Sequence, residues 1–248
     1  MKYCTLLLLT FFSINLIGQM QPIINPCAQA ISIHVVVIGS STAAGTGPTS
    51  SDSAWVNRYR KYLQDINPQN QVTNLAVGGT TTYHIMPTGF VAPAGRPATN
   101  INKNVTQAIN LGADAIILNM PSNDAANGFG VNEQMSNFII INDSSNSANV
   151  PIWICTTQPR SFGATQDQIQ LGVRDSVLSQ FGNFALDFWN GFADANYNIL
   201  PQYDSGDGVH MNNAGHRVLN NRVINAGIPN YLADTLAYTD HVFTSLFF

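Results

Sequence analysis

Residues 35–45 read Val-Val-Val-Ile-Gly-Ser-Ser-Thr-Ala-Ala-Gly, a β-branched run that stops at a glycine and is followed by two serines. A continuous apolar run of this length is typical of a buried strand, and the glycine with the small residues after it indicates a tight turn. A turn at the end of a strand can hold a hydroxyl above the sheet. Ser41 is therefore the candidate nucleophile, and Ser40 is the competing one.

A serine hydroxyl is a weak nucleophile unless a base takes its proton. His210 is the candidate base, because imidazole exchanges protons near neutral pH. Asp207, three residues earlier, could accept from the other ring nitrogen and fix the tautomer. Alternatively, Asp207 and His210 could lie in a surface loop without a catalytic role, or could be a pair of metal ligands. The chain contains neither H-x-H nor H-E-x-x-H, so we expect no metal site and no cofactor.

Strand-like and helix-like segments alternate along the chain. This alternation predicts an α/β fold with a parallel sheet, right-handed crossovers and helices on both faces. Ligands of such sheets bind beyond the C-terminal ends of the strands, where the candidate residues lie. The expected strands are Ile33–Ile38, Val72–Val77, Asp114–Asn119, Val150–Cys155 and Phe184–Asp187.

Apolar residues at helical spacing, with polar residues able to cap the first turn, predict the helices between these strands. We expect residues 80–97 to be a loop over the mouth of the site, residues 142–149 to be a surface loop, and His216 to lie on the surface of the last helix. The expected helices run from Ser51 or Ser53 to about Ile66, from Asn100 or Asn102 to Leu111, over Val131–Ile141 and Thr165–Phe181, and from Asn212 or Asn213 through Val223.

The composition narrows the possible partners. The chain has 248 residues, of which 45% are hydrophobic and 10% charged, and its net charge is −4 without a basic run. Nucleic acid and anionic membranes are therefore not expected as partners. The length favours one α/β domain, and we expect a monomer.

The N-terminus resembles a secretory signal. Lys2 precedes an apolar run from Leu6 to Phe12, which is short for a membrane-spanning helix. We expect a signal peptide over residues 1–20, a single domain over residues 21–248 with its core at about 32–226, and no stable membrane insertion after cleavage. The predicted location is secreted, periplasmic or cell-surface. An uncleaved anchor is the alternative.

Removal of the signal leaves Cys27 and Cys155. Cys27 precedes the first strand and Cys155 ends a later one, so the two should lie at opposite ends of the sheet. A strand spans about 17–20 Å, which is beyond the reach of a disulfide. We expect no disulfide and a buried Cys155, with a nucleophilic role for Cys155 as the alternative.

Taken together, four blocks resemble the SGNH/GDSL hydrolase family. They are Gly39-Ser40-Ser41, Asn74-Leu75-Ala76-Val77-Gly78-Gly79, Pro121-Ser122-Asn123-Asp124 and the final Asp207-Gly208-Val209-His210. The resemblance implies a three-layer α/β/α sandwich whose five-stranded parallel sheet has the flavodoxin-like order 2-1-3-4-5. It also implies that Ser41, Gly79 and Asn123 form an oxyanion hole.

The chain departs from the family pattern at two positions. Ser40 stands where the family often has aspartate, which removes a carboxylate beside the nucleophile. Pro121 stands where the third block usually begins with glycine, and proline has a fixed φ and no N–H. The second departure could change the path of the loop that carries Asn123.

The resemblance implies a secreted serine hydrolase that cleaves carboxylic esters through an acyl-enzyme. A polar and aromatic mouth favours a carbohydrate O-acetylesterase, so we expect a small-molecule or glycan ester as substrate; the mouth residues are Tyr83, His84, Phe90, Trp189 and Tyr203. One alternative is a lipase or thioesterase acting on longer acyl chains. The other is a glycan-binding surface protein without activity.

Overall fold

The computed structural model describes residue 24 and residues 26–235. The expected signal peptide and residues 236–248 lie outside this part of the chain. A five-stranded parallel sheet forms the centre, in the order β2-β1-β3-β4-β5. This confirms the predicted sheet and its order. The strands are β1 (His34–Gly39), β2 (Gln71–Asn74), β3 (Ala115–Asn119), β4 (Ile152–Cys155) and β5 (Ala185–Leu186).

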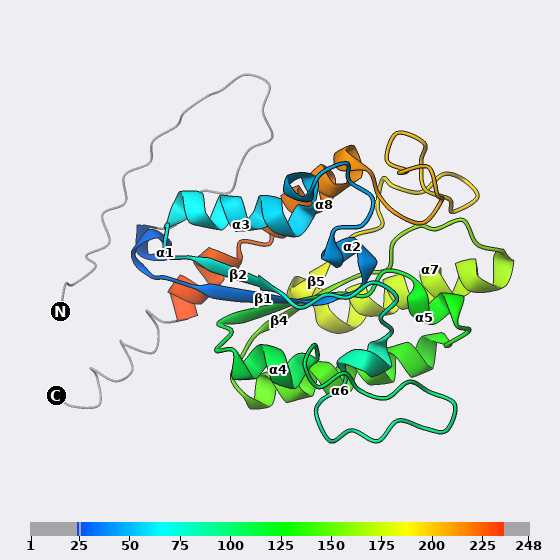
Figure 1. Cartoon of the computed structure of the whole chain (residues 1–248), viewed down its shortest axis with the longest axis horizontal. Helices are drawn as coiled ribbons and strands as arrows, with labels where there is room; N and C mark the ends of the chain where they lie inside the picture. Colours follow the sequence, from blue (N-terminus) through cyan, green and yellow to red (C-terminus); the bar gives the residue numbers. More distant parts are fainter. Residues whose placement is uncertain (1–23, 25, 236–248) are drawn as a thin grey trace.

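The side chains of β1 alternate between two hydrophobic layers, as the period of a strand requires. Val35 and Val37 pack into one core cluster, and Val36 and Ile38 pack into another. Helices α3 and α8 cover the first face and lie above the sheet in Figure 1, whereas α4 and α6 lie below it. Because both faces are covered, β1 can be apolar throughout. The molecule therefore has the predicted α/β/α layers.

The helices follow the strands in sequence. The described α-helices are α1 (Pro26–Ala30), α2 (Ser41–Ala44), α3 (Trp55–Ile66), α4 (Val105–Asn110), α5 (Asn123–Ala126), α6 (Val131–Ser147), α7 (Ala164–Phe181) and α8 (Asn213–Asn225). Three short 3₁₀ helices are η1 (Ser51–Ser53), η2 (Thr82–Ile85) and η3 (Gly182–Phe184). None of the helices in the described part is long and apolar enough to cross a membrane.

Several predicted boundaries were wrong: α4 begins at Val105 rather than Asn100 or Asn102, and β4 and β5 are shorter than predicted. Two other boundaries differ for reasons that the side chains show. Strand β2 ends at Asn74 rather than Val77, because the Asn74 side chain donates to the Ala43 carbonyl and accepts from the Ala76 N–H. Helix α6 continues to Ser147, so most of the expected loop 142–149 is helical. Polar residues extend this helix on its solvent side, and Ser145 Oγ closes its end by donating to the Val150 carbonyl.

Cys155 lies at the end of β4 and is a buried free thiol. Burial raises the pKa of this thiol well above its usual value. A thiol that stays protonated is a poor nucleophile. The structure therefore gives Cys155 a packing position, as the sequence predicted.

Candidate active site

Ser41 occupies the point where β1 turns into α2. Strand β1 ends at Gly39, and the Ser40 N–H donates to the Asn119 carbonyl at 3.0 Å. A Cβ on Gly39 would lie only 2.3 Å from that carbonyl oxygen, so this crossing of two backbones requires glycine. Ser40 is fully buried, whereas Ser41 is half-buried and lies at the C-terminal edge of the sheet.

The structure brings Ser41, His210 and Asp207 together from distant parts of the chain. His210 Nε2 lies 3.0 Å from Ser41 Oγ, and His210 Nδ1 lies 2.6 Å from Asp207 Oδ2. These distances join a hydroxyl, an imidazole and a carboxylate in one hydrogen-bonded series. With Nδ1 protonated toward Asp207, Nε2 presents its lone pair to the Ser41 hydroxyl.

Asp207 is held by its own loop. Its Oδ1 accepts from the backbone N–H groups of Val209 and His210, at 2.9 and 2.8 Å. Partial burial would raise the pKa of Asp207, but the hydrogen bonds from the His210 side chain and from these N–H groups outweigh it. The pKa therefore lies below its usual value. Asp207 is thus a stable anion beside His210 at neutral pH.

Gly79 and Asn123 lie on the neighbouring loops. Gly79 adopts a φ of +81°, a left-handed conformation that favours glycine, and the adjacent Gly78 packs near Ser41 Cβ. Among the described residues, the backbone N–H groups of Ser41 and Gly79 donate to no protein acceptor. Two free N–H groups at one edge of the sheet can bind an anionic oxygen.

The Asn123 side chain is already hydrogen-bonded. Its Nδ2 donates to Ser40 Oγ at 2.5 Å and to the Thr80 carbonyl at 2.9 Å. At position 40, where the family often has aspartate, this chain has a serine whose hydroxyl accepts a hydrogen bond from Asn123. The Pro121 carbonyl accepts from the Gln158 N–H at 3.2 Å and from Gln170 Nε2 at 3.1 Å, which joins the loop before Asn123 to the loop after β4 and to α7.

Sequence reasoning gave Asp124 no role. Its carboxylate is buried and accepts from both the N–H and the hydroxyl of Thr82. Burial raises the pKa of Asp124 to about 6 in spite of these hydrogen bonds. Asp124 therefore ties the loop after Gly79 to the helix that carries Asn123. Its place next to Asn123 in the third block was the only signal available from the sequence.

The prediction for His216 was wrong. His216 is fully buried rather than on the surface of α8. Its Nδ1 accepts from the Trp55 N–H at 3.0 Å, and its Nε2 lies 3.2 Å from the Thr46 carbonyl. Burial lowers the pKa of His216 to about 4, so the ring is neutral at pH 7. His216 joins α8 to the start of α3 beneath the loop that follows Ser41.

The predicted aromatic mouth is wrong for two of its five residues, Tyr83 and Trp189, whereas His84, Phe90 and Tyr203 are partly exposed. Tyr83 and Trp189 are buried, at 4% and 5% exposure, and Tyr83 donates to Glu133 within the core below the sheet. Tyr203 packs edge-to-face on Phe192. Residues 82–85 form η2, and the rest of the predicted loop over residues 80–97 contains neither helix nor strand. The sequence of a loop does not show which of its aromatic side chains are buried. Buried and exposed aromatic residues therefore could not be distinguished here from the sequence alone.

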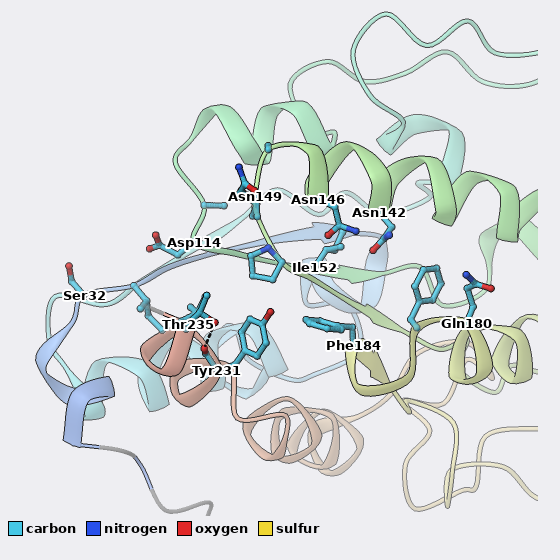
Figure 2. Close-up of a pocket in the computed structure, with 17 residues that line it drawn as sticks. Ser32, Asp114, Asn142, Asn146, Asn149, Ile152, Gln180, Phe184, Tyr231 and Thr235 are labelled. Atoms are coloured by element: carbon cyan, nitrogen blue, oxygen red, sulfur yellow. Dashed lines mark hydrogen bonds between the residues drawn. The ribbon is translucent and has the colours of Figure 1, made fainter. Parts of the chain in front are cut away.

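A cavity of about 790 Å³ lies far from Ser41. Figure 2 shows it between Phe184, Tyr231 and the Asn142 and Asn146 side chains of α6. Its lining includes residues that precede β1, β3 and β4, so it opens at the N-terminal edge of the sheet. The hydrogen-bonded series of Ser41, His210 and Asp207 is at the other edge.

The comparisons with known proteins agree with this geometry. The model of the GDSL-like lipase/acylhydrolase family matches residues 37–218. The chain belongs to this family. Its members hydrolyse carboxylic esters, and the protein is therefore a carboxylic ester hydrolase of the GDSL-like family. The matched region begins within β1 and ends in α8, so it contains all the candidate residues.

Solved structures share the fold at low sequence identity. A protein assigned to the G-D-S-L lipolytic family from Desulfitobacterium hafniense DCB-2 is 15% identical, with a TM-score of 0.59 over 79% of this chain and 99% of that one. The psychrotrophic esterase EstA from a Pseudoalteromonas species is 13% identical, with a TM-score of 0.56 over 79% and 96%. A GDSL-like lipase from Bacteroides thetaiotaomicron is 14% identical, with a TM-score of 0.54 over 84% and 91%. The search of curated proteins found no match.

Proposed function

We propose that this GDSL-like hydrolase is an exported serine esterase in which Ser41 is the nucleophile, His210 the general base and acid, and Asp207 the residue that orients His210. The observation that carries the proposal is the series of 3.0 and 2.6 Å contacts through the His210 ring. Each atom stands where the chemistry of acyl transfer needs it. The N-terminal signal-like segment of the sequence supports export.

The proposed reaction has two halves. Ser41 Oγ attacks the ester carbonyl carbon while His210 Nε2 takes the hydroxyl proton. The bond between the carbonyl carbon and the alcohol oxygen then breaks, and His210 returns the proton to the departing alcohol. Water then attacks the acyl carbon while His210 Nε2 takes one of its protons. The bond between this carbon and Ser41 Oγ breaks, His210 returns the proton to Ser41 Oγ, and the carboxylic acid is released. The Asp207 anion stabilises the imidazolium that forms in each half.

The oxyanion of each tetrahedral intermediate would bind the Ser41 and Gly79 N–H groups and the Asn123 amide. The two backbone donors have no protein acceptor in the described part of the chain. One Asn123 N–H is directed at Ser40 Oγ, so an oxyanion beside Ser41 could share or replace that acceptor. Donors fixed in advance cost little reorganisation during the reaction.

The proposed substrate is a short acyl ester of a polar alcohol, with an O-acetylated carbohydrate as the class we favour. The Asn123 amide is bonded to two buried polar residues next to the proposed nucleophile and oxyanion donors, through Ser40 Oγ and the Thr80 carbonyl. Such surroundings suit a small acyl group and a hydroxylated alcohol better than a long alkyl chain, because polar groups lose hydrogen bonds beside hydrocarbon. Aromatic stacking on the predicted mouth no longer contributes to this argument.

Hydrolysis of p-nitrophenyl esters from acetate to decanoate tests the proposal. We expect the highest kcat/KM with acetate, and a fluorophosphonate should label the protein at Ser41, as located by peptide mass spectrometry. A preference for decanoate would move the substrate to lipids or thioesters while keeping the mechanism. Absence of both hydrolysis and labelling, including on acetylated glycans, would favour a binding protein without activity.

Replacing Asn123 by alanine tests the oxyanion hole. We expect Asn123→Ala to lower kcat by about 10²–10³-fold with a much smaller change in KM, because the lost donor acts on charge that develops in the transition state. The control is Asn132→Ala, which removes an exposed amide from α6. Equal activity of Asn123→Ala and the control would remove Asn123 from the proposed hole.

A further inference from the structure

The loop after β4 lies against the proposed catalytic residues, although none of the family-like blocks includes it. Gln158 Oε1 accepts from the hydroxyl of Thr42, the residue after Ser41, at 3.0 Å. Three residues further on, the Ser161 N–H donates to the Gly208 carbonyl at 2.7 Å. This loop is therefore fixed at one end to the turn that carries Ser41 and at the other to the turn that carries His210.

Arg160 lies between these two attachments. Its Nη1 is 3.4 Å from the hydroxyl of Ser122, the residue before Asn123. Its guanidinium stacks on the Phe162 ring, with Cζ 4.6 Å from the ring centroid. The nearby Asp207 carboxylate favours the charged form of this guanidinium and so raises its pKa. The guanidinium thus sits at the junction of the loops that carry Asn123 and His210.

The charge of Arg160 is not matched by any ion pair within residues 26–235. Among the described residues, Arg160 takes part in no ion pair, and Asp207 is engaged with His210. Arg160 is only half-exposed, and partial burial lowers its pKa although nearby Asp207 opposes this change. An arginine remains charged in proteins, and its five N–H donors match a carboxylate in a bidentate arrangement. Its single long hydrogen bond to Ser122 leaves most of these donors free.

We propose that Arg160 binds a carboxylate on the alcohol part of the ester, so that the enzyme prefers esters of acidic alcohols, such as an acetylated sugar acid. This inference rests on the proposed esterase function. We place the carboxylate on the alcohol part because the loop of Arg160 is hydrogen-bonded to the loop that carries the proposed acid. His210 Nε2 must protonate the departing alcohol oxygen, and Arg160 is fixed by Ser161 to the loop that carries His210.

A charged and a neutral acetate ester test this assignment, because the change in their rate ratio between wild type and variant cancels the intrinsic difference in reactivity. The probes are 4-acetoxybenzoate, which carries a carboxylate on the alcohol, and its neutral methyl ester. The measured quantity is the ratio of kcat/KM for the charged probe to that for the neutral one. We expect Arg160→Gln to lower this ratio by about 10-fold or more while changing hydrolysis of the neutral probe little, because a hydrogen-bonded charge is lost from one substrate only.

Two further variants separate a charge effect from damage to the loop. Arg160→Lys keeps the charge without the planar fork, and it should retain part of the preference. Lys61→Gln removes the same charge from the exposed face of α3 and should leave the ratio unchanged. Raising the salt concentration to about 0.5 M should lower the ratio for the wild type and not for Arg160→Gln, because salt screens the attraction.

The outcomes distinguish this inference from the proposed function. Hydrolysis of both probes with a ratio that Arg160→Gln does not alter would overturn the role of Arg160 and leave the esterase intact. An equal loss on both probes would show that Arg160 only supports the loop, which also overturns the inference. The proposed function would also be overturned if the wild type hydrolysed neither probe, or if a fluorophosphonate did not inhibit the hydrolysis.

Discussion

Replacing Ser41 by alanine is expected to lower kcat for p-nitrophenyl acetate by about 10⁴–10⁶-fold, since the acyl-enzyme can no longer form. The residual rate would come from the oxyanion donors and His210 acting on water. His210→Ala should have an effect of similar size, and the double variant should be little worse than either single one. Catalytic residues that act as a unit lose their contribution to the rate when any one of them is removed, so the second substitution removes little more.

Ser40→Ala is the matched control. The Ser40 hydroxyl is fully buried and accepts from Asn123, so its loss should disturb the position of the amide without removing the nucleophile. We expect a decrease of about 10-fold at most, in line with a lost neutral hydrogen bond. A larger loss in Ser40→Ala than in Ser41→Ala would identify Ser40 as the nucleophile. Circular dichroism should show that both variants are folded.

Replacing His216 by alanine is expected to lower the free energy of unfolding at pH 7 by about 2–4 kcal/mol. The substitution leaves a cavity beneath the loop after Ser41 and removes the acceptor of the Trp55 N–H. Urea denaturation measures the change. Arg217→Ala, on the exposed side of the same helix, is the control and should change stability by less than about 0.5 kcal/mol.

The contribution of His216 should also depend on pH. Its pKa is about 4 in the folded protein and 6.5 in an unfolded chain, so the unfolded state binds the proton more readily. The stabilisation is fully present above pH 6.5 and is lost as the pH falls toward about 4. The loss amounts to about 3 kcal/mol over this range.

His216→Gln isolates this titration. The difference in unfolding free energy between the wild type and the variant should shrink steadily from pH 7.5 to 4.5. Burial raises the pKa of Asp124 to about 6, so the stabilisation from its protonated form is lost as the pH rises. This effect is opposite to that of His216, and it cancels when the two proteins are compared at the same pH. A difference that stays constant with pH would show that His216 does not titrate as a buried neutral ring.

The sequence predicted the sheet well because the signals that specify it are local. The apolar run of β1, the glycine that ends it and the alternation with helices each depend on a few neighbouring residues. Errors arose where the end of an element depends on a side-chain hydrogen bond to a residue outside that element. Asn74 ends β2 through the Ala43 carbonyl, and the polar sequence of 142–147 remains helical because Val150 closes its end.

The candidate site shows the same division. The four blocks identified Ser41, Gly79, Asn123, Asp207 and His210 from the sequence, since each block is a short motif with its own chemistry. The supporting residues have no such motif. Asp124, Gln158 and His216 act through partners that lie 42, 116 and 161 positions away, and nothing near them in the sequence indicates those partners.

The sequence by itself determined the type of fold and the family, and it proposed the residues that carry the chemistry, because periodicity and motif spacing are properties of neighbouring positions. Only the tertiary structure decided that His210 Nε2 meets the Ser41 hydroxyl across 169 positions and that Tyr83 and Trp189 are buried. It also placed Arg160 beside Ser122 without an ion pair to any residue in the described part of the chain. These outcomes depend on which surfaces pack against one another. Burial and distance are set by the whole chain rather than by any segment of it.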